Sequence, residues 1–410
     1  MTVVRSKETR PVVIVGAGPV GMTCALALHR LDVPVIVVEA EPAPVKDQRA
    51  ASTHPPTMEI LAGMGLEPQL MDRGLVSTTF RYFDRISGEM VCEFDCGLLK
   101  DETPYPFVLQ HEQFKLVDTI LKVLRGQPGF EVRFKTRYTG HEQSGSGVRV
   151  TIEADGKPET IEGSYLIGCD GGHSSVRRNT GIEFQGFTFP EKFIKIGTTF
   201  DFMSVGRNYV YRNYFSDPDE WCNLFKVRGD GPPGVWRCVF PCRVGEADEE
   251  ALSPQGLEAR LHKFFPGFSN FEIAYRSIYN VSQRVAATFR KGRVFVAGDS
   301  AHVNNPIGGM GLNGGIHDVA NLAPRLAELW HGRGDDALLD GYTRQRHKAQ
   351  HDYVQAQTIR NKRELEEKDP VVRRQHLNEL RKTAETPELA RKFLLNATLI
   401  QSLRTVAAVA

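Results

Sequence analysis

Two glycine-rich segments stand almost the whole chain apart, and each follows a short apolar run. The first covers residues 11–21 and reads Pro-Val-Val-Ile-Val-Gly-Ala-Gly-Pro-Val-Gly. The second covers residues 293–315, where an apolar run ends near Asp299 and a glycine-rich loop follows. Short apolar runs rich in β-branched residues are typical of buried parallel strands. A single long ligand that contacts both segments would therefore bring the two ends of the chain into one domain.

The first segment has the pattern of a dinucleotide-binding turn. Residues 11–15 predict a strand, and the helix expected over residues 19–31 would direct its positive end at phosphates. The first glycine allows a tight turn, the second lets the backbone approach a pyrophosphate, and the third lets the helix pack closely. The predicted ligand contacts are Gly16, Ala17, Gly18, Pro19, Val20 and Gly21.

A second strand and an acid favour dinucleotide binding over an ordinary glycine turn. Residues 34–38 form another apolar run, and Glu39 follows it directly. An acid at this place, about 20 residues after the glycines, binds ribose hydroxyls in dinucleotide-binding folds.

The late segment predicts a strand over residues 293–297, then Asp299, a loop and a helix over residues 312–330. An acid at the carboxyl end of such a strand can accept hydrogen bonds from sugar or ribityl hydroxyls. The glycines leave room for a flat ring, and a helix N-terminus stabilises negative charge on that ring. FAD is the cofactor that fits both segments. The predicted contacts are Gly298, Asp299, Pro306, Gly309, Gly311, Leu312 and Asn313.

A third segment, residues 165–177, repeats the order of strand, acid, glycine turn and helix start. With it, the chain resembles the group A flavoprotein monooxygenases, the para-hydroxybenzoate hydroxylase-like family, over about residues 10–350. The family motif DGxxSxVR matches at Asp170, Gly171, Ser174, Val176 and Arg177. The family's usual Pro-Pro pair is Asn305-Pro306 here. The rest of the late family motif, GDAAHxxPPxGGxGxN, matches at Gly298, Asp299, Ala301, His302, Pro306, Gly308, Gly309, Gly311 and Asn313.

The resemblance implies a cofactor, further contacts and a reaction. It implies FAD with NADH or NADPH as cosubstrate, and flavin contacts from Arg49, Gln110, Asp170 and Gly171. It implies hydroxylation of a phenolic or hydroxypyridine-type ring with O2, through a flavin C4a-hydroperoxide. The sequence shows no second strand–glycine–helix unit for a separate nicotinamide domain, so the nicotinamide is expected to visit a groove near Asp170.

The predicted fold class is α/β, with a dinucleotide-binding, Rossmann-like FAD domain interrupted by an inserted, mostly antiparallel substrate domain. Alternating aromatic residues in the longer insertion favour a sheet with one face buried. The final segment is expected to pack on the body or on a second subunit. We assign residues 1–72, 107–182 and 283–350 to the FAD domain, residues 73–106 and 183–282 to the substrate domain, and residues 351–410 to a helical C-terminal tail.

The candidate catalytic residues come from the predicted substrate sheet and from the flavin loops. Tyr211 and Tyr214 fall on that sheet, where a hydroxyl could polarise the ring hydroxyl, although sheet aromatics more often fill a core. His54, Arg49 and Pro306 complete the set, since the resemblance places them beside the flavin or the substrate. The family often has a histidine at the position of His54, which favours a structural role for it over a catalytic one. His302 is expected to brace the flavin loop through a hydrogen bond. The histidines, cysteines and acids show no spacing that predicts a metal site.

Composition narrows the expected partners. A net charge of +1 gives no reason to expect nucleic acid or acidic membranes. Seven cysteines without a CxxC spacing suit a reducing cytoplasm, and the first ten residues lack the apolar core of a signal peptide. Apolar runs are too short for a membrane helix. We therefore expect a cytoplasmic monomer or homodimer that acts on a small aromatic molecule and O2.

Two other functions stand beside the aromatic hydroxylase. A flavin-dependent halogenase would carry a Trp-x-Trp-x-Ile-Pro segment, but Trp221, Trp236 and Trp330 are isolated. A non-hydroxylating flavin-binding redox protein would not need the complete set of flavin motifs.

Overall fold

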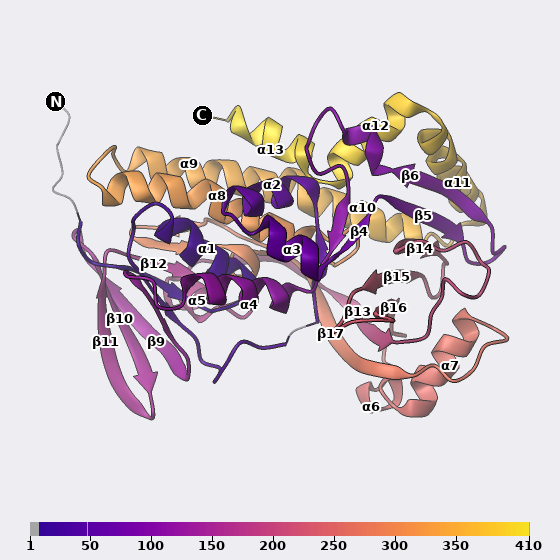
Figure 1. The fold of residues 1–410 in the computed structure, drawn as a ribbon, viewed down its shortest axis with the longest axis horizontal. Coiled ribbons are helices and arrows are strands. Elements are labelled where there is room, and N and C mark those ends of the chain that lie inside the picture. Colours follow the sequence, from indigo (N-terminus) through magenta and orange to yellow (C-terminus); the bar gives the residue numbers. More distant parts are fainter. Residues whose placement is uncertain (1–7, 47, 410) are drawn as a thin grey trace.

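Both glycine-rich segments follow strands of one six-stranded sheet (Figure 1). All neighbouring strands are parallel except β18 and β19. The strands predicted at 11–15, 34–38 and 293–297 are present with slightly shorter ends, which confirms the α/β, Rossmann-like architecture. In spatial order the strands are β18 (Arg290–Lys291), β19 (Val294–Val296), β12 (Tyr165–Gly168), β1 (Val12–Val15), β2 (Val35–Val38) and β8 (Phe130–Arg133).

Alternation along β1 assigns its side chains to two different layers. Val12 and Ile14 belong to a core shared with helices, whereas Val13 and Val15 face the opposite side. The sheet is therefore buried on both faces, as apolar β-branched strands require. The helices are α1 (Pro19–His29), α4 (Gln113–Leu124) and α8 (Met310–Trp330), and the opposite layer is a meander of β9 (Thr136–Gln143), β10 (Val148–Ala154) and β11 (Lys157–Gly163).

The structure is a computed structural model that describes residues 8–46 and 48–409. Residues 1–7 lie outside the described residues. They begin the first predicted FAD-domain block, and they make up most of the N-terminal segment that was expected to lack a signal-peptide core. Residue 410, the end of the predicted tail, lies outside them too.

An eight-stranded sheet forms the second large element, on the right in Figure 1. Only β14 and β5 are parallel neighbours within it, so the prediction of a mostly antiparallel sheet is confirmed. Its strand order is β20 (His302–Val303), β17 (Ile273–Ala286), β13 (Phe184–Thr198), β16 (Val235–Pro241), β15 (Cys222–Val227), β14 (Arg212–Ser216), β5 (Thr79–Asp84) and β6 (Met90–Asp95).

The expectation that this sheet buries only one face is wrong, because both faces are covered. Phe193 packs in one core with Leu394 of the tail, whereas the adjacent Ile194 packs in another core with Leu257. Leu257 lies on α7 (Pro254–Phe264), which follows the short α6 (Asp248–Ala251). Two separate segments of the chain therefore cover the two faces.

A third, small sheet also carries residues of the predicted site. It consists of β3 (Ser52–Thr53), β7 (Val108–Gln110) and β4 (Leu75–Ser77). The helices α2 (Pro55–Gly63) and α3 (Glu67–Arg73) lie between β3 and β4 in the chain. Because β4 falls in the block assigned to the substrate domain and pairs with β7 of the FAD block, the exact domain boundaries stay a prediction.

The C-terminal region is helical. After α8 the chain forms α9 (Ala337–Lys348), a π-helical segment (Ala349–Gln355), α10 (Ala356–Leu365), α11 (Pro370–Glu385), α12 (Pro387–Ala397) and α13 (Ile400–Ala407). Figure 1 shows α11 and α12 beside β5 and β6, at the edge of the large sheet.

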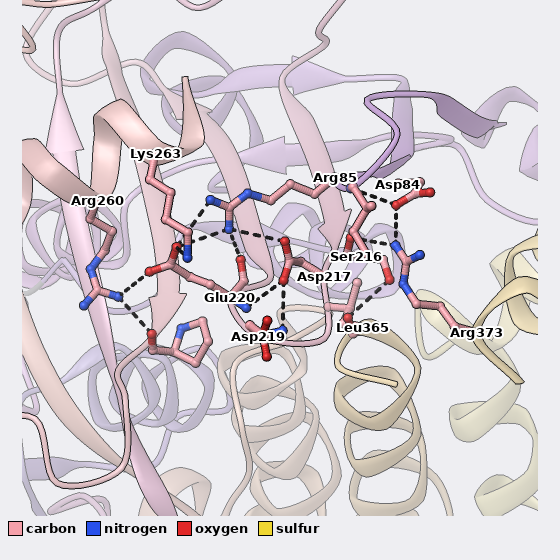
Figure 2. A network of polar contacts seen from close by, with 12 residues as sticks. Asp84, Arg85, Ser216, Asp217, Asp219, Glu220, Arg260, Lys263, Leu365 and Arg373 are labelled. Carbon is pink, nitrogen blue, oxygen red and sulfur yellow. Dashed lines mark hydrogen bonds and ion pairs between the residues drawn. The ribbon is translucent and has the colours of Figure 1, made fainter. Parts of the chain in front are cut away.

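Polar contacts fasten this tail to the large sheet (Figure 2). Arg373 of α11 forms an ion pair with Asp84 and donates to the carbonyl of Ser216 at 3.2 Å. The Leu365 carbonyl accepts hydrogen bonds from the backbone N–H of Asp217 at 3.0 Å and from the Ser216 hydroxyl at 3.2 Å. The tail is therefore tied to the end of β14.

Candidate active site

The first glycine turn is shaped by close backbone packing. Gly16 has φ +103°, and a Cβ there would lie 2.4 Å from the Cys169 carbonyl oxygen. A Cβ on Gly21 would lie 2.0 Å from the Gly16 carbonyl oxygen. By contrast, a Cβ on Gly18 would meet no other described atom within 4 Å. Gly16 and Gly21 thus shape the turn itself, and Gly18 leaves its outer side open for a ligand to approach the backbone.

Glu39 stands at the end of β2, directly beside this turn. Its Oε2 accepts a hydrogen bond from the Ala17 backbone N–H at 2.7 Å, and its Oε1 accepts one from the Glu41 N–H at 2.9 Å. The structure therefore brings the predicted ribose-binding acid to the first glycine turn.

Asp170 connects the middle motif to the late one. Its Oδ1 accepts hydrogen bonds from the hydroxyls of Ser174 at 2.5 Å and Ser300 at 3.1 Å. Its Oδ2 accepts from two backbone N–H groups at the start of α5 (Ser175–Asn179). Both carboxylate oxygens thus bind the chain's own donors, and Asp170 fixes the position of Gly171 and of the loop beyond β19.

Arg49 and Asp299 face each other across the space between their loops. Their closest charged atoms are 3.7 Å apart, and both side chains are more than 40% exposed, which leaves them accessible to a ligand. The Arg49 carbonyl accepts a hydrogen bond at 2.9 Å from Arg237 of β16, a residue that the sequence did not single out. The large sheet therefore helps to hold the loop that carries Arg49.

The N-terminus of α8 begins at a glycine in a left-handed conformation. Gly309, the residue before the helix, has φ +70°. Asn313 in the first turn donates to the carbonyls of Ser52 at 2.9 Å and Gly309 at 2.6 Å, and accepts from the His54 N–H at 2.9 Å. The predicted residue Asn313 therefore joins the helix start to the strand that carries Ser52.

The early and late motifs are in direct contact at Val20. A Cβ on Gly315 would lie 2.6 Å from the Val20 side chain, and a Cβ on Gly298 would lie 2.9 Å from it. Small residues at these two positions let α1 approach both α8 and the loop beyond β19. One extended ligand can therefore reach both motifs.

Gln110 supplies an unsatisfied donor at the same place. Its Oε1 accepts a hydrogen bond from the Ser52 hydroxyl at 2.8 Å. Its buried Nε2 has no hydrogen-bond partner within residues 8–46 and 48–409. A buried donor without a partner is costly, and a ligand carbonyl would satisfy it. A dinucleotide cofactor with a polar ring system fits this donor together with the open side of Gly18 and the exposed Asp299.

These groups form one site, which we call the cofactor cradle. It consists of the turn at residues 16–21, Glu39, Arg49, Gln110, Asp299 and the N-terminus of α8 with the glycines that pack around it.

A buried ionic cluster supports the late loop from behind. Asp318 of α8 is fully buried and accepts from His302 Nε2 at 2.6 Å, Arg346 Nε at 2.7 Å and the Gly298 N–H at 3.0 Å. Burial alone would raise the pKa of Asp318, but His302 and Arg346 outweigh it and lower that pKa. The expectation that His302 braces the loop is confirmed, and its partner is Asp318.

An aromatic pocket lies next to the α8 loop. It is bounded by the large sheet, the loop before α8 and the tail. Because its walls come from segments far apart in sequence, only the folded chain forms it. The residues that line it are His54, Phe80, Tyr82, Val108, Arg212, Tyr214, Gly308, Met310, Gln357, Asn361, Phe393, Ala397 and Thr398.

Only some of the predicted catalytic residues line the aromatic pocket. Tyr214 and His54 line the aromatic pocket, whereas Tyr211 does not and precedes β14. Arg49 and Pro306 do not line it either, since Arg49 belongs to the cradle and Pro306 to the turn before α8. The pocket thus retains one of the two tyrosine candidates.

His54 is neutral at ordinary pH. Burial, followed by the nearby Arg212 charge, lowers the pKa of His54 to about 3. Its Nδ1 is buried and lacks a hydrogen-bond partner among the described residues. A neutral imidazole with such a nitrogen beside a pocket can exchange a hydrogen bond with a bound polar group.

The sequence did not single out Arg212 or the tail residues of the pocket. Arg212 was visible as the only charged side chain in the aromatic stretch from Tyr209 to Phe215. Phe393 was visible only as part of an apolar stretch, and nothing in its local pattern indicates that it reaches β5.

The aromatic pocket is narrow, with a volume of about 20 Å³, whereas a second hollow, of about 530 Å³, lies between α1, α2 and α8. Its lining includes Arg30, Met64 and Pro324 and none of the predicted site residues. The predicted site residues lie instead at the aromatic pocket and the adjoining cradle.

Two further features bear on the kind of protein. Within the described ranges, no group of histidine, cysteine or acidic side chains is arranged to hold a metal ion. None of the helices described combines the length and apolar character needed to cross a bilayer.

Comparison with known proteins identifies the family to which the chain belongs. A family model described as an FAD binding domain matches residues 9–357. A para-nitrophenol 4-monooxygenase from Pseudomonas sp. (strain WBC-3) is 30% identical over 398 residues, 96% of this chain and 97% of that protein. A 6-hydroxy-3-succinoylpyridine 3-monooxygenase from Pseudomonas putida (strain DSM 28022 / S16) is 32% identical over 333 residues, 80% of this chain and 82% of that protein.

A solved structure agrees over nearly the whole chain. The crystal structure of p-nitrophenol 4-monooxygenase from Pseudomonas putida DLL-E4 superposes with a TM-score of 0.90 at 28% identity. The match covers 97% of this chain and 98% of that one. Fold and cradle together are those of a flavin-dependent oxidoreductase. This chain belongs to the FAD binding domain family, within the group A flavoprotein monooxygenases, and its cofactor is FAD.

Proposed function

We propose that this protein is a single-component FAD-dependent monooxygenase that uses NADH or NADPH and O2 to hydroxylate a phenolic or hydroxypyridine-type ring. The observation that carries the proposal is an aromatic pocket directly beside the loop that leads into α8. The relatives named above, which by their names act on a nitrophenol and a hydroxypyridine, support the same ring class.

The proposed FAD contacts follow the two motif regions. The turn at residues 16–21 would hold the pyrophosphate with backbone N–H groups and the N-terminus of α1. Glu39 would bind the ribose, and Asp299 the ribityl hydroxyls. Gln110 and the N-terminus of α8 would meet the ring, with Arg49 at its exposed side. When bound, FAD supplies hydride acceptance and the activation of O2.

Tyr214 would position a proton at the substrate. Its hydroxyl oxygen accepts a hydrogen bond from Arg212 Nη2 at 3.0 Å, so its own proton is available to another acceptor. In the pocket that acceptor would be the ring oxygen of the substrate. Met310 and Phe393 supply apolar walls that exclude water from the reacting ring.

The assembly and the compartment are part of the proposal as well. The seven cysteines all lie within the described residues and are unpaired, which suits the proposed reducing cytoplasm. We propose a monomer or homodimer, with the nicotinamide approaching near Asp170 and not through a second binding domain.

The alternatives have less support. Trp221, Trp236 and Trp330 are buried and do not line the aromatic pocket, so the segment expected of a halogenase has no counterpart at the pocket. A flavin-binding protein without hydroxylase activity would have no use for a neutral histidine, a tyrosine and an arginine in one aromatic pocket.

The decisive experiment measures NADH and NADPH oxidation by the FAD-loaded protein in air, with and without phenols and hydroxypyridines. We expect particular rings to stimulate oxidation and to yield a product that carries one oxygen atom from O2. If no ring stimulates oxidation and only hydrogen peroxide forms, the hydroxylase proposal fails.

A further inference from the structure

Arg212 is a buried cation without an acidic partner among the described residues. The residue is 5% exposed, and no carboxylate of the described chain forms an ion pair with it. Its Nη2 donates a hydrogen bond to the Tyr214 hydroxyl at 3.0 Å, whereas its Nε is buried and has no partner among the described residues. A buried charge without a counter-charge is strongly unfavourable, so a ligand that supplies one should bind here.

Aromatic rings surround the guanidinium of Arg212. Its guanidinium lies 5.0 Å from the Phe80 ring centre and 6.0 Å from that of Tyr214. Tyr82 stacks on Tyr214 with ring centres 4.9 Å apart. Cation–π contacts partly offset the cost of the charge, but they leave the Nε donor unsatisfied. The site therefore suits a planar ring that carries a negative charge.

The titratable groups around Arg212 supply no counter-charge near neutral pH. Burial raises the pKa of Tyr82 and raises that of Cys96 to about 11, so both groups stay neutral. Burial lowers the pKa of His54 to about 3, so the imidazole is neutral as well. Tyr214 shares its hydroxyl with Arg212.

Two acids act on these neighbours, and neither forms an ion pair with Arg212. Asp95 and Glu364 contribute to the raised pKa values of Cys96 and Tyr82, after burial, which is the larger cause. Burial also raises the pKa of Glu364. The positive charge of Arg212 is therefore left for a ligand to match.

We propose that Arg212 is the anion receptor of the aromatic pocket, and that the substrate binds as a phenolate whose oxygen accepts a hydrogen bond from Arg212 Nε. This inference rests on the proposed hydroxylase function. The phenol loses its proton to solvent before or during binding, so no base in the pocket has to hold that proton. Arg212 thereby selects acidic phenols, which are ionised near neutral pH, over neutral rings of the same shape.

The test uses 4-nitrophenol, whose phenol and phenolate forms absorb differently, with FAD-loaded protein and no NAD(P)H. Because Arg212 stabilises the anion, bound ligand should stay ionised to a pH at least about one unit below that at which free ligand is half ionised, a tenfold preference. Nitrobenzene, which has no ionisable oxygen, should bind at least about tenfold more weakly than the phenolate.

Three variants make the test specific. Arg212→Gln should abolish the shift in ionisation, and Arg212→Lys should retain part of it, because lysine keeps the charge but loses the planar guanidinium. Arg374→Gln removes an exposed arginine of α11 and should leave the shift unchanged. Retained FAD in each variant, read from its absorbance, shows that the fold is intact.

Three results would overturn the inference, two of them in binding and one in the flavin. One is a wild-type protein that binds 4-nitrophenol in its neutral form or does not bind the anion. The other is an Arg212→Gln variant with an unchanged ionisation shift. If Arg212→Gln instead alters the flavin reduction potential without changing phenolate binding, the anion that Arg212 receives is the reduced flavin and the proposal fails. Phenolate binding without ring-stimulated NAD(P)H oxidation would overturn the hydroxylase function and leave this site standing.

Discussion

The cofactor cradle and the aromatic pocket adjoin each other but are built in different ways. The cradle is made largely of glycines and backbone groups, where Gly16, Gly21 and Gly315 permit contacts that any side chain would block. The pocket is made of side chains from β5, β14 and α12, elements that lie far apart in sequence. Close backbone contacts leave no room for a Cβ atom, whereas substitution of a pocket side chain can change the shape of the pocket while the fold persists. The cradle should therefore resist substitution, and the pocket should determine which ring is accepted.

The largest effect is expected from a pair of glycine substitutions in the cradle. Gly21→Ala places a Cβ 2.0 Å from the Gly16 carbonyl oxygen, so the turn must move, at a cost of about 4 kcal/mol or more in stability. Gly18→Ala meets no described atom within 4 Å and should change the unfolding free energy of the FAD-free protein by less than about 0.5 kcal/mol.

The same pair separates folding from cofactor binding. Gly18→Ala should still weaken FAD binding about tenfold or more, because its methyl group would stand where we propose that the pyrophosphate approaches the backbone. Chemical unfolding and FAD titration measure the two effects. Equal stability losses in both variants would show that the two glycines do not have separate roles.

The next effect concerns catalysis in the pocket. Tyr214→Phe removes a hydroxyl that lines the pocket, while Tyr211→Phe removes one that does not. Hydroxylation by Tyr214→Phe should fall about a hundredfold, as expected for loss of a proton-positioning group, while NAD(P)H oxidation continues and yields hydrogen peroxide. Product and peroxide assays give the ratio. Similar coupling in both variants and the wild type would exclude Tyr214 and direct attention to His54.

The cradle could be predicted from sequence because its signals are local. In each motif a strand, a glycine turn, a helix start and an acid lie within about 30 residues, and each has a distinct physical requirement. The pocket could not be predicted to the same degree. Arg212 and Phe393 acquire their roles only when α12 packs near β14, about 180 residues earlier in the chain, and near β5, about 310 residues earlier. The second covered face of the large sheet was missed for the same reason, since the pattern of a strand does not show what packs on it.

A smaller effect is expected on stability at low pH, and it comes from His111, next to Gln110 of the cradle. Burial, followed by Lys115 and Arg73, lowers the pKa of His111 to about 3 from an ordinary value of 6.5. Because the unfolded chain then binds a proton that the folded protein excludes, stability is fully present above pH 6.5 and falls as the pH decreases toward 3. Between about pH 7 and pH 5 this histidine should account for about 2 kcal/mol of lost stability.

His111→Gln tests that assignment. The variant should lose part of the wild-type pH dependence, measured by urea unfolding at about pH 7 and pH 5. His262→Gln, a change at a half-exposed histidine of α7, serves as the control. An unchanged slope in His111→Gln would mean that His54 and His317, whose pKa values are also lowered by burial, carry the acid sensitivity instead.

The smallest effect is expected from Phe393, where the tail closes the pocket. Its ring stacks on Phe94 with centres 4.3 Å apart and lies 6.4 Å from Phe80. Phe393→Ala removes a wall of the pocket without touching the cradle, so the KM for an aromatic substrate should rise about tenfold, or about 1.4 kcal/mol, while the FAD dissociation constant stays unchanged. Phe187→Ala, the same change at an exposed ring of β13, should alter neither quantity. If Phe393→Ala weakened FAD binding and substrate binding equally, the cradle and the pocket would be one coupled unit, and the tail would support the cofactor as much as the ring.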